Sequence, residues 1–184
     1  MNDSYAEVTG EGSVRMQRLL PGPIERIWTY LTDSKLRGQW LASGEMDLKV
    51  GGRVELRFLH RELSPHPDPI PERYKDMEHG HTFSGKITQL EPPTLLAYTW
   101  GESYGDSEVT FELAPRGADV LLTITHRRLA DRDEMASVAG GWHTHIGILI
   151  DRLHGRTPPG FWSAHAKVEG EYERRFAAAR GAKR

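Results

Sequence analysis

The 184-residue chain contains no cysteine. This absence excludes disulfide bonds, thiolate nucleophiles and cysteine-ligated zinc or iron–sulfur sites. Long apolar runs are also missing, so no segment is expected to cross a bilayer. The first residues lack the basic start and apolar stretch of a signal peptide. We therefore expect a cytoplasmic protein that does not insert into a membrane.

An excess of charge of one sign is lacking as well. The 24 Lys and Arg residues and the 26 Asp and Glu residues leave a formal net charge of −2. No overall field favours nucleic acid or an anionic membrane as a partner. The basic stretch 174–184 is short, and we interpret it as a solvated helix end. The length predicts one domain with a core and room for a pocket.

Sequence motifs of common enzymes are absent. The chain has no Gly-x-Ser-x-Gly elbow, no phosphate-binding glycine loop and no dinucleotide fingerprint. Nine histidines suggest a metal site, but His143 and His145 would point about 200° apart on a helix. No carboxylate–histidine pattern with metal-ligand spacing accompanies them. We predict no metal, no cofactor and no catalytic residue, although an enzyme is not ruled out.

The first part of the chain predicts a strand followed by two short helices. After a loose terminus over residues 1–11, apolar residues alternate with polar ones over 14–20, and Arg18 falls on the apolar face. Either the strand bends there or Arg18 points inward. A proline start and an apolar stripe predict a helix over 24–31. Asp33 is expected to cap a second helix that carries Trp40 inward.

Alternating segments separated by turn residues predict an antiparallel sheet through the middle of the chain. The expected strands cover 46–50, 53–60, 83–87, 96–100, 109–113 and 120–126. The connection over 62–80 contains four prolines and is long for a compact domain. We expect it to be either a functional lid or a tolerated insertion.

The last part of the chain predicts two helices. Asp131 and Glu134 form a capping pattern before a long helix whose apolar stripe runs from Met135 to Leu153. Prolines after residue 157 end this helix. A final helix is expected over 161–180, with an apolar stripe of its own.

The order of these elements resembles the START-like (SRPBCC) superfamily, in particular the branch similar to the C-terminal domain of the activator of Hsp90 ATPase. The resemblance covers roughly residues 12–155. It rests on residues 18–28, Trp40, Gly51-Gly52, 85–87, 123–126 and 140–142. The resemblance implies an α+β helix-grip fold, in which a curved antiparallel sheet wraps around a long C-terminal helix. Residues 156–184 would add a helical extension to the same domain.

Members of the superfamily include lipid and hormone binders, aromatic cyclases and co-chaperone domains, so the fold alone leaves the function open. The fold implies a cavity between sheet and helix, where Trp100 and Trp142 could meet. Polar residues on its wall need a partner, which for His126 is either a ligand or a neighbouring backbone group or tyrosine. The predicted cavity residues are Arg18, Trp28, Trp40, Phe58, Phe83, Tyr98, Trp100, Phe111, His126, Trp142 and Ile146.

Three functions follow from this interpretation. The first is binding of a small, mostly apolar molecule in the cavity. The second is a protein-interaction module with a chaperone-type partner, whose contact surface would be the final helix. The third is a cyclase-like or hydrolase-like enzyme using Arg18, Tyr98 and His126. The amphipathic final helix is also compatible with a homodimer.

Overall fold

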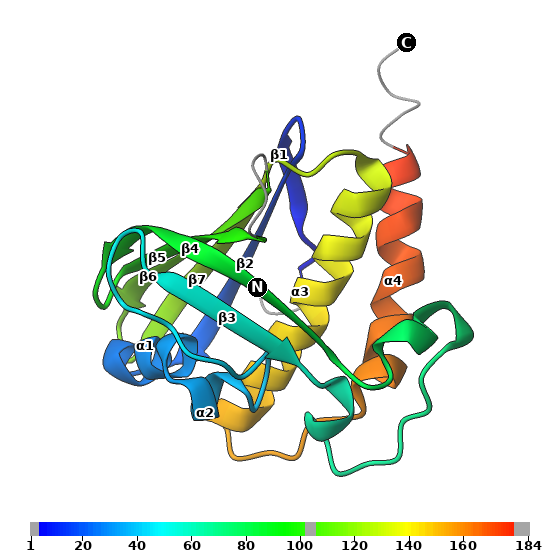
Figure 1. The fold of residues 1–184 in the computed structure, drawn as a ribbon, viewed down its shortest axis with the longest axis horizontal. Helices are drawn as coiled ribbons and strands as arrows, with labels where there is room; N and C mark the ends of the chain where they lie inside the picture. Colours follow the sequence, from blue (N-terminus) through cyan, green and yellow to red (C-terminus); the bar gives the residue numbers. More distant parts are fainter. Residues whose placement is uncertain (1–3, 102–105, 179–184) are drawn as a thin grey trace.

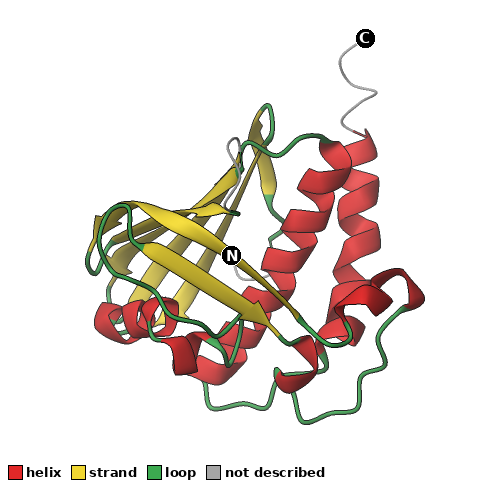
Figure 2. Ribbon diagram, viewed as in Figure 1, coloured by secondary structure: helices red, strands yellow, loops and turns green. Residues whose placement is uncertain are grey.

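The computed structural model describes residues 4–101 and 106–178. A curved antiparallel sheet lies against a long helix, α3 (Arg132–Leu153), and a further helix, α4 (Phe161–Ala178), runs beside α3 (Figures 1 and 2). The sheet order is β1-β2-β7-β6-β5-β4-β3. Its strands are β1 (Glu7–Gly10), β2 (Ser13–Pro21), β3 (Arg53–Phe58), β4 (His81–Glu91), β5 (Leu95–Trp100), β6 (Ser107–Arg116) and β7 (Asp119–Arg127). The fold is the expected α+β helix grip.

The beginning of the chain is more ordered than expected. Residues Glu7–Gly10 form β1, which pairs with the start of β2. We had expected a loose terminus there, because four residues with little apolar content carry a weak strand pattern. In β2, Arg18 points inward and is only 2% exposed. Of the two alternatives for this strand, the inward arginine is therefore the one observed.

Two short helices follow β2, as predicted. Helix α1 (Ile24–Thr32) begins after Pro23, and α2 (Ser34–Arg37) is capped by the Asp33 carboxylate, which accepts from the main-chain N–H of Leu36 at 2.8 Å. Arg37 ends α2 and is 1% exposed. Its guanidinium donates to main-chain carbonyls of Thr32, Ala42 and Gly44, and so ties the surrounding turns together.

One predicted strand is wrong. Residues 46–50 form only an isolated bridge between Met46 and Val54 and then a turn. The pattern over 46–50 is apolar at alternate positions, but Leu48 and Val50 are exposed and have no neighbouring strand to cover them.

Gly85 in β4 explains the glycine of the 85–87 motif. A Cβ at this position would lie 2.0 Å from the carbonyl oxygen of Thr99. Only glycine fits this close approach of strands.

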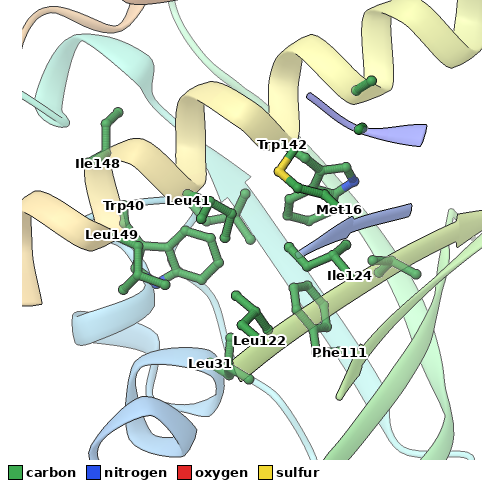
Figure 3. Packing of buried hydrophobic residues seen from close by; sticks show 14 of the residues in the cluster. Met16, Leu31, Trp40, Leu41, Phe111, Leu122, Ile124, Trp142, Ile148 and Leu149 are labelled. Carbon is green, nitrogen blue, oxygen red and sulfur yellow. The ribbon is translucent and has the colours of Figure 1, made fainter. Parts of the chain in front are cut away.

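Helix α3 packs against the inner face of the sheet, as the helix grip requires. The Asp131 carboxylate accepts from the N–H of Glu134 at 2.8 Å and caps the helix. The predicted stripe from Met135 to Leu153 faces the core, where Trp142 lies above Ile124 and Phe111 (Figure 3). Burial of this apolar face stabilises the domain.

Helix α4 lies along α3 and buries its own apolar stripe there. Phe161, His165, Tyr172 and Phe176 are all at most 6% exposed. Gly140 in α3 faces this contact, and a Cβ there would reach His165 at an ordinary van der Waals distance of 3.5 Å. The described part of α4 ends at Ala178, and residues 179–180 of the predicted helix lie outside the described residues. No helix of the described chain combines the length and apolar character needed to span a membrane.

The proline-rich connection 62–80 is anchored to α4. It contains two 3-10 turns, η1 (His60–Glu62) at its start and η2 (Glu72–Met77) near its end. The Asp68 carboxylate accepts from the N–H of Trp162 and from the N–H of Ser163, the latter at 3.0 Å. Asp68 therefore acts as a cap for α4, supplied from a distant part of the chain.

Candidate functional site

A cavity of about 190 Å³ lies between the sheet, α3, α4 and the η2 segment. Most of its wall consists of aromatic rings and imidazoles. The aromatic residues are Phe58, Tyr74, Phe83, Trp100, Trp142, Phe161 and Trp162. The imidazoles are His60, His81, His126, His145 and His165, and the wall is completed by Leu41, Met77, Ser137, Val138 and Gly141. These residues come from the segment after α2, from β3 and η1, from η2, β4, β5 and β7, and from α3 and α4, which the fold brings together.

The strand side of the wall is a continuous row of rings. Phe58 stacks on Phe83 at a centroid distance of 5.2 Å, and Phe83 meets Trp100 edge to face at 4.8 Å. Trp100 in turn meets Trp142 of α3 at 5.2 Å. Such edge-to-face and offset contacts are favourable beyond the area that they bury. The row fixes the shape of the cavity and leaves flat ring faces and edges along one side.

His145 lies on α3 at the centre of the helix side. Its Nδ1 is 2.7 Å from the main-chain carbonyl oxygen of Trp40. Burial lowers the pKa of His145 to about 4, although the hydrogen bond to Trp40 works in the opposite direction. The ring is therefore neutral at pH 7. Its neighbours include His60 at 5.5 Å and Phe161 at 4.7 Å between ring centroids.

Burial favours the neutral form of the other imidazoles as well. Burial lowers the pKa of His60 to about 3, with further contributions from His145 and His81. Burial also lowers the pKa of His81 and of His165. In the described chain, the Nδ1 atoms of His60 and His81 are buried without a hydrogen-bond partner. The wall thus contains polar atoms whose hydrogen-bonding capacity is unused.

His126 makes two hydrogen bonds within the protein. The indole N–H of Trp142 can only donate, so Nδ1 of His126 accepts at 3.1 Å. The neutral ring then carries its proton on Nε2, which donates to Oγ of Ser107 at 2.7 Å. Burial lowers the pKa of His126 to about 3. His126 thus makes structural hydrogen bonds, but its partners are Trp142 and Ser107 and not the backbone group or tyrosine that we expected.

The η2 segment and the start of α4 cover one side of the cavity. Tyr74 stacks on Trp162 at a centroid distance of 5.0 Å, and its hydroxyl donates to Glu169 of α4. Arg73 forms ion pairs with Glu169 at 3.0 Å and with Glu173 at 3.1 Å. The cover is therefore attached by an aromatic stack, a hydrogen bond and exposed ion pairs.

The structure brings five of the predicted cavity residues together at this site, namely Phe58, Phe83, Trp100, His126 and Trp142. The other six lie outside the cavity wall. Trp40, Tyr98, Phe111 and Ile146 are fully buried in the core, where neighbouring side chains fill the space around them. Trp28 is half-buried on α1. Arg18 lies on β2, toward the edge of the sheet opposite to β3 and β4.

Of the helix side, sequence reasoning found Trp142 only, and for the 62–80 connection it left open whether the segment covers a site or is a tolerated insertion. Val138, Gly141, Trp142 and His145 are spaced at three and four residues, which places them on one face of α3. Phe161 and His165 repeat this spacing on α4. The spacing is visible in the sequence, but it does not distinguish a cavity wall from a filled core. Among these four α3 residues, only Gly141 indicates open space in the sequence, because it has no side chain to fill the core.

The described part of the wall has no Asp, Glu, Lys or Arg side chain and no set of residues arranged to hold a metal ion. Among residues 4–101 and 106–178, no Asp, Glu, Lys or Arg lines the cavity. Over the same described ranges, no three His, Cys, Asp or Glu residues are grouped so that they could hold a metal ion. The arrangement can enclose a neutral molecule with flat, apolar faces.

Comparison with solved structures shows the same fold in several bacterial proteins. A protein of Bordetella parapertussis, encoded by gene BPP1335, has 41% sequence identity and a TM-score of 0.77, over 95% of this chain and 94% of that chain. CalU16 from Micromonospora echinospora shares the fold at 22% identity and a TM-score of 0.64, over 90% and 86% of the two chains. Protein CV1439 from Chromobacterium violaceum has 23% identity and a TM-score of 0.60, over 77% and 97%.

No curated protein matches the chain significantly. A family model, described as Activator of Hsp90 ATPase homolog 1-like protein, matches residues 21–154. This match spans the two short helices, β3 to β7 and all of α3, and it stops before α4. The sequence match, the helix-grip fold and the Bordetella relative agree, and the chain belongs to the activator of Hsp90 ATPase homolog 1-like branch of the START-like superfamily.

Proposed function

We propose that the protein binds a small, mostly apolar molecule in the aromatic cavity. The observation that carries this proposal is open space of about 190 Å³ that is lined by aromatic rings and lies beside the hydrophobic core. An apolar cavity of about 150 Å³ is large enough to bind benzene. A molecule with one or two rings therefore matches the size and the chemistry of this site.

The protein-interaction alternative has less support. It needs an exposed apolar face on α4, but the stripe from Phe161 to Phe176 is buried against α3. The argument for a homodimer is weakened for the same reason, because the buried stripe is the surface expected to contact a second copy. The enzyme alternative needs acid–base groups directed at a ligand. Both nitrogens of His126 are engaged within the protein, and Arg18 lies outside the cavity wall.

Two glycines of α3 provide a matched test. Gly141 lines the cavity and Gly147 is exposed elsewhere on the helix, and a Cβ at either position would meet no atom within 4 Å. Gly141→Leu would place a side chain in the cavity, whereas Gly147→Leu would place the same side chain in solvent. Each substitution should preserve the helix, because leucine favours helical structure more than glycine does.

The measurement is binding of 2-naphthol, followed by quenching of tryptophan fluorescence and by calorimetry. We expect binding by the wild type and by Gly147→Leu with equal affinity, and at least about tenfold weaker binding by Gly141→Leu, since the added side chain occupies the site. Circular dichroism would verify that both variants are folded. Absence of binding by the wild type, or equal binding by all three proteins, would contradict the proposal.

A further inference from the structure

The hydrogen bond between His145 and Trp40 determines which nitrogen of His145 carries the proton. A carbonyl oxygen can only accept, so Nδ1 of His145 is protonated and donates to Trp40 at 2.7 Å. A neutral imidazole has a single ring proton, so Nε2 is left with a lone pair and is a hydrogen-bond acceptor. Trp40 is itself fully buried, which holds the carbonyl in place.

Nε2 of His145 is an acceptor without a protein donor. The side chain lines the cavity and is only 5% exposed, and no hydrogen bond to Nε2 is formed within the described part of the chain. Phe58, His60 and Phe161 surround the ring with centroid distances of 6.1, 5.5 and 4.7 Å. Unlike Nδ1 of His60 and His81, Nε2 of His145 keeps some accessible surface, so a donor that enters the cavity can reach this acceptor.

The charge of the wall limits the ligand further. The cavity-lining residues within 4–101 and 106–178 include no cation that could pair with an anionic ligand and no carboxylate that could pair with a cationic one. Two charged residues of the cover, Arg73 and Glu169, are paired with each other at 3.0 Å. Burying an unpaired charge among these rings would be strongly unfavourable. The site therefore selects neutral molecules.

On the basis of the function proposed above, we infer that the ligand class is an uncharged aromatic molecule with a hydroxyl or N–H group that donates to Nε2 of His145. Its ring lies among the aromatic side chains, between Trp142 on the helix side and Phe58 on the strand side. His145 thus determines the orientation of the ligand. The row of aromatic rings from Phe58 to Trp142 selects a planar ligand.

Three probes with the same ring system test this inference on the intact protein. 2-Naphthol offers a donor, 2-methoxynaphthalene has the same rings without a donor, and 2-naphthoate adds a negative charge. We expect 2-naphthol to bind up to about tenfold more tightly than 2-methoxynaphthalene, which is the value of one hydrogen bond. 2-Naphthoate should bind more weakly than either. Tighter binding of the anion would overturn the inference.

Variants of His145 then assign the preference to this residue. His145→Asn retains a side-chain donor for the Trp40 carbonyl and removes the ring acceptor, and His145→Phe retains a ring and removes both. Both variants should bind 2-naphthol and 2-methoxynaphthalene with similar affinity. The control is His154→Asn, because Nδ1 of exposed His154 also donates to a carbonyl, that of Ile150 at 2.8 Å, but outside the cavity. This control should keep the full preference.

The outcomes separate the inference from the proposed function. If the wild type binds both uncharged probes equally and Gly141→Leu blocks them, the cavity is a binding site but the role of His145 is wrong. If the hydroxyl preference persists in both His145 variants, the role of His145 is also wrong. If neither uncharged probe binds the wild type, the proposed function and the inference are both overturned.

Discussion

The indole N–H of Trp142 donates to Nδ1 of His126 at 3.1 Å and so connects the middle of α3 to the end of β7. Both side chains are at most 4% exposed. The same contact closes one side of the cavity and leaves His126 with no free nitrogen, since Nε2 donates to Ser107. A structural hydrogen bond and the shape of the site therefore depend on one pair of residues.

Trp142→Phe should destabilise the protein by about 1–3 kcal/mol beyond the loss of ring volume, because it leaves Nδ1 of His126 buried without a donor. Trp162→Phe is a matched control, as the indole N–H of Trp162 makes no hydrogen bond within the described chain and the residue is similarly buried. Urea unfolding gives both free energies. Equal losses in the two variants would show that the hydrogen bond contributes nothing.

The free energy of unfolding should depend on pH through the buried histidines. The pKa values of His60 and His126 are about 3 and that of His145 about 4 in the folded protein, against 6.5 for an ordinary histidine. Below pH 6.5 the unfolded chain binds more protons than the folded one. Stability is therefore complete above about pH 6.5 and falls as the pH decreases toward 4, by up to about 1.4 kcal/mol per pH unit for each histidine.

Urea unfolding between pH 7 and pH 5 checks this dependence. His60→Leu should reduce the slope, since one of the buried titrating groups is removed. A stability that is constant over this range would contradict the neutral, buried state of the histidines.

Asp68→Ala should loosen the cover of the cavity. The variant removes the acceptor for the N–H groups of Trp162 and Ser163 and so leaves the start of α4 uncapped, at a cost of about 0.5–2 kcal/mol. Hydrogen exchange should become faster in the first turn of α4 and in residues 62–80. Asp76→Ala, in the same segment but exposed and without a comparable bond, should have no such effect. Unchanged exchange in Asp68→Ala would contradict the anchoring role.

Arg37→Met should destabilise the protein by at least about 3 kcal/mol. The guanidinium is buried and donates to carbonyls of Thr32, Ala42 and Gly44, which would all lose a donor. Arg26→Met is the comparison, because exposed Arg26 donates only to the carbonyl of Leu153. The free energy of unfolding of Arg26→Met should fall by less than about 1 kcal/mol. A similar change in the thermal midpoint for both variants would refute the assigned role of Arg37.

The helix-grip architecture could be predicted because its signals are local and repeated. Alternation over β2 and β5–β7, the Asp33 and Asp131 caps, and the stripe of α3 each depend on residues close together in the chain. Residues 46–50 failed because alternation alone does not supply a partner strand. Arg37 was not recognised as a buried residue, since its acceptors are main-chain carbonyls that leave no pattern in the sequence.

The cavity was harder to predict than the fold. Tyr98, Phe111 and Trp100 share one inward phase, but only Trp100 borders the open space, since the other two lie where α3 fills the grip. The contacts that complete the cavity come from α4 and the η2 segment, and they join residues that are far apart in the sequence. Phe161 against His60, at a centroid distance of 4.1 Å, is one such contact. No pattern in a single sequence predicts that Phe161 and His60 come into contact.

The five tryptophans allow a direct measurement of where a ligand binds. Trp100, Trp142 and Trp162 line the cavity, whereas Trp28 and Trp40 lie outside its wall. In a ¹H–¹⁵N correlation spectrum, titration with 2-naphthol should shift the indole signals of the first three and leave those of Trp28 and Trp40 in place. Unchanged signals for the three cavity tryptophans, or the largest shift at Trp28, would contradict binding in the cavity.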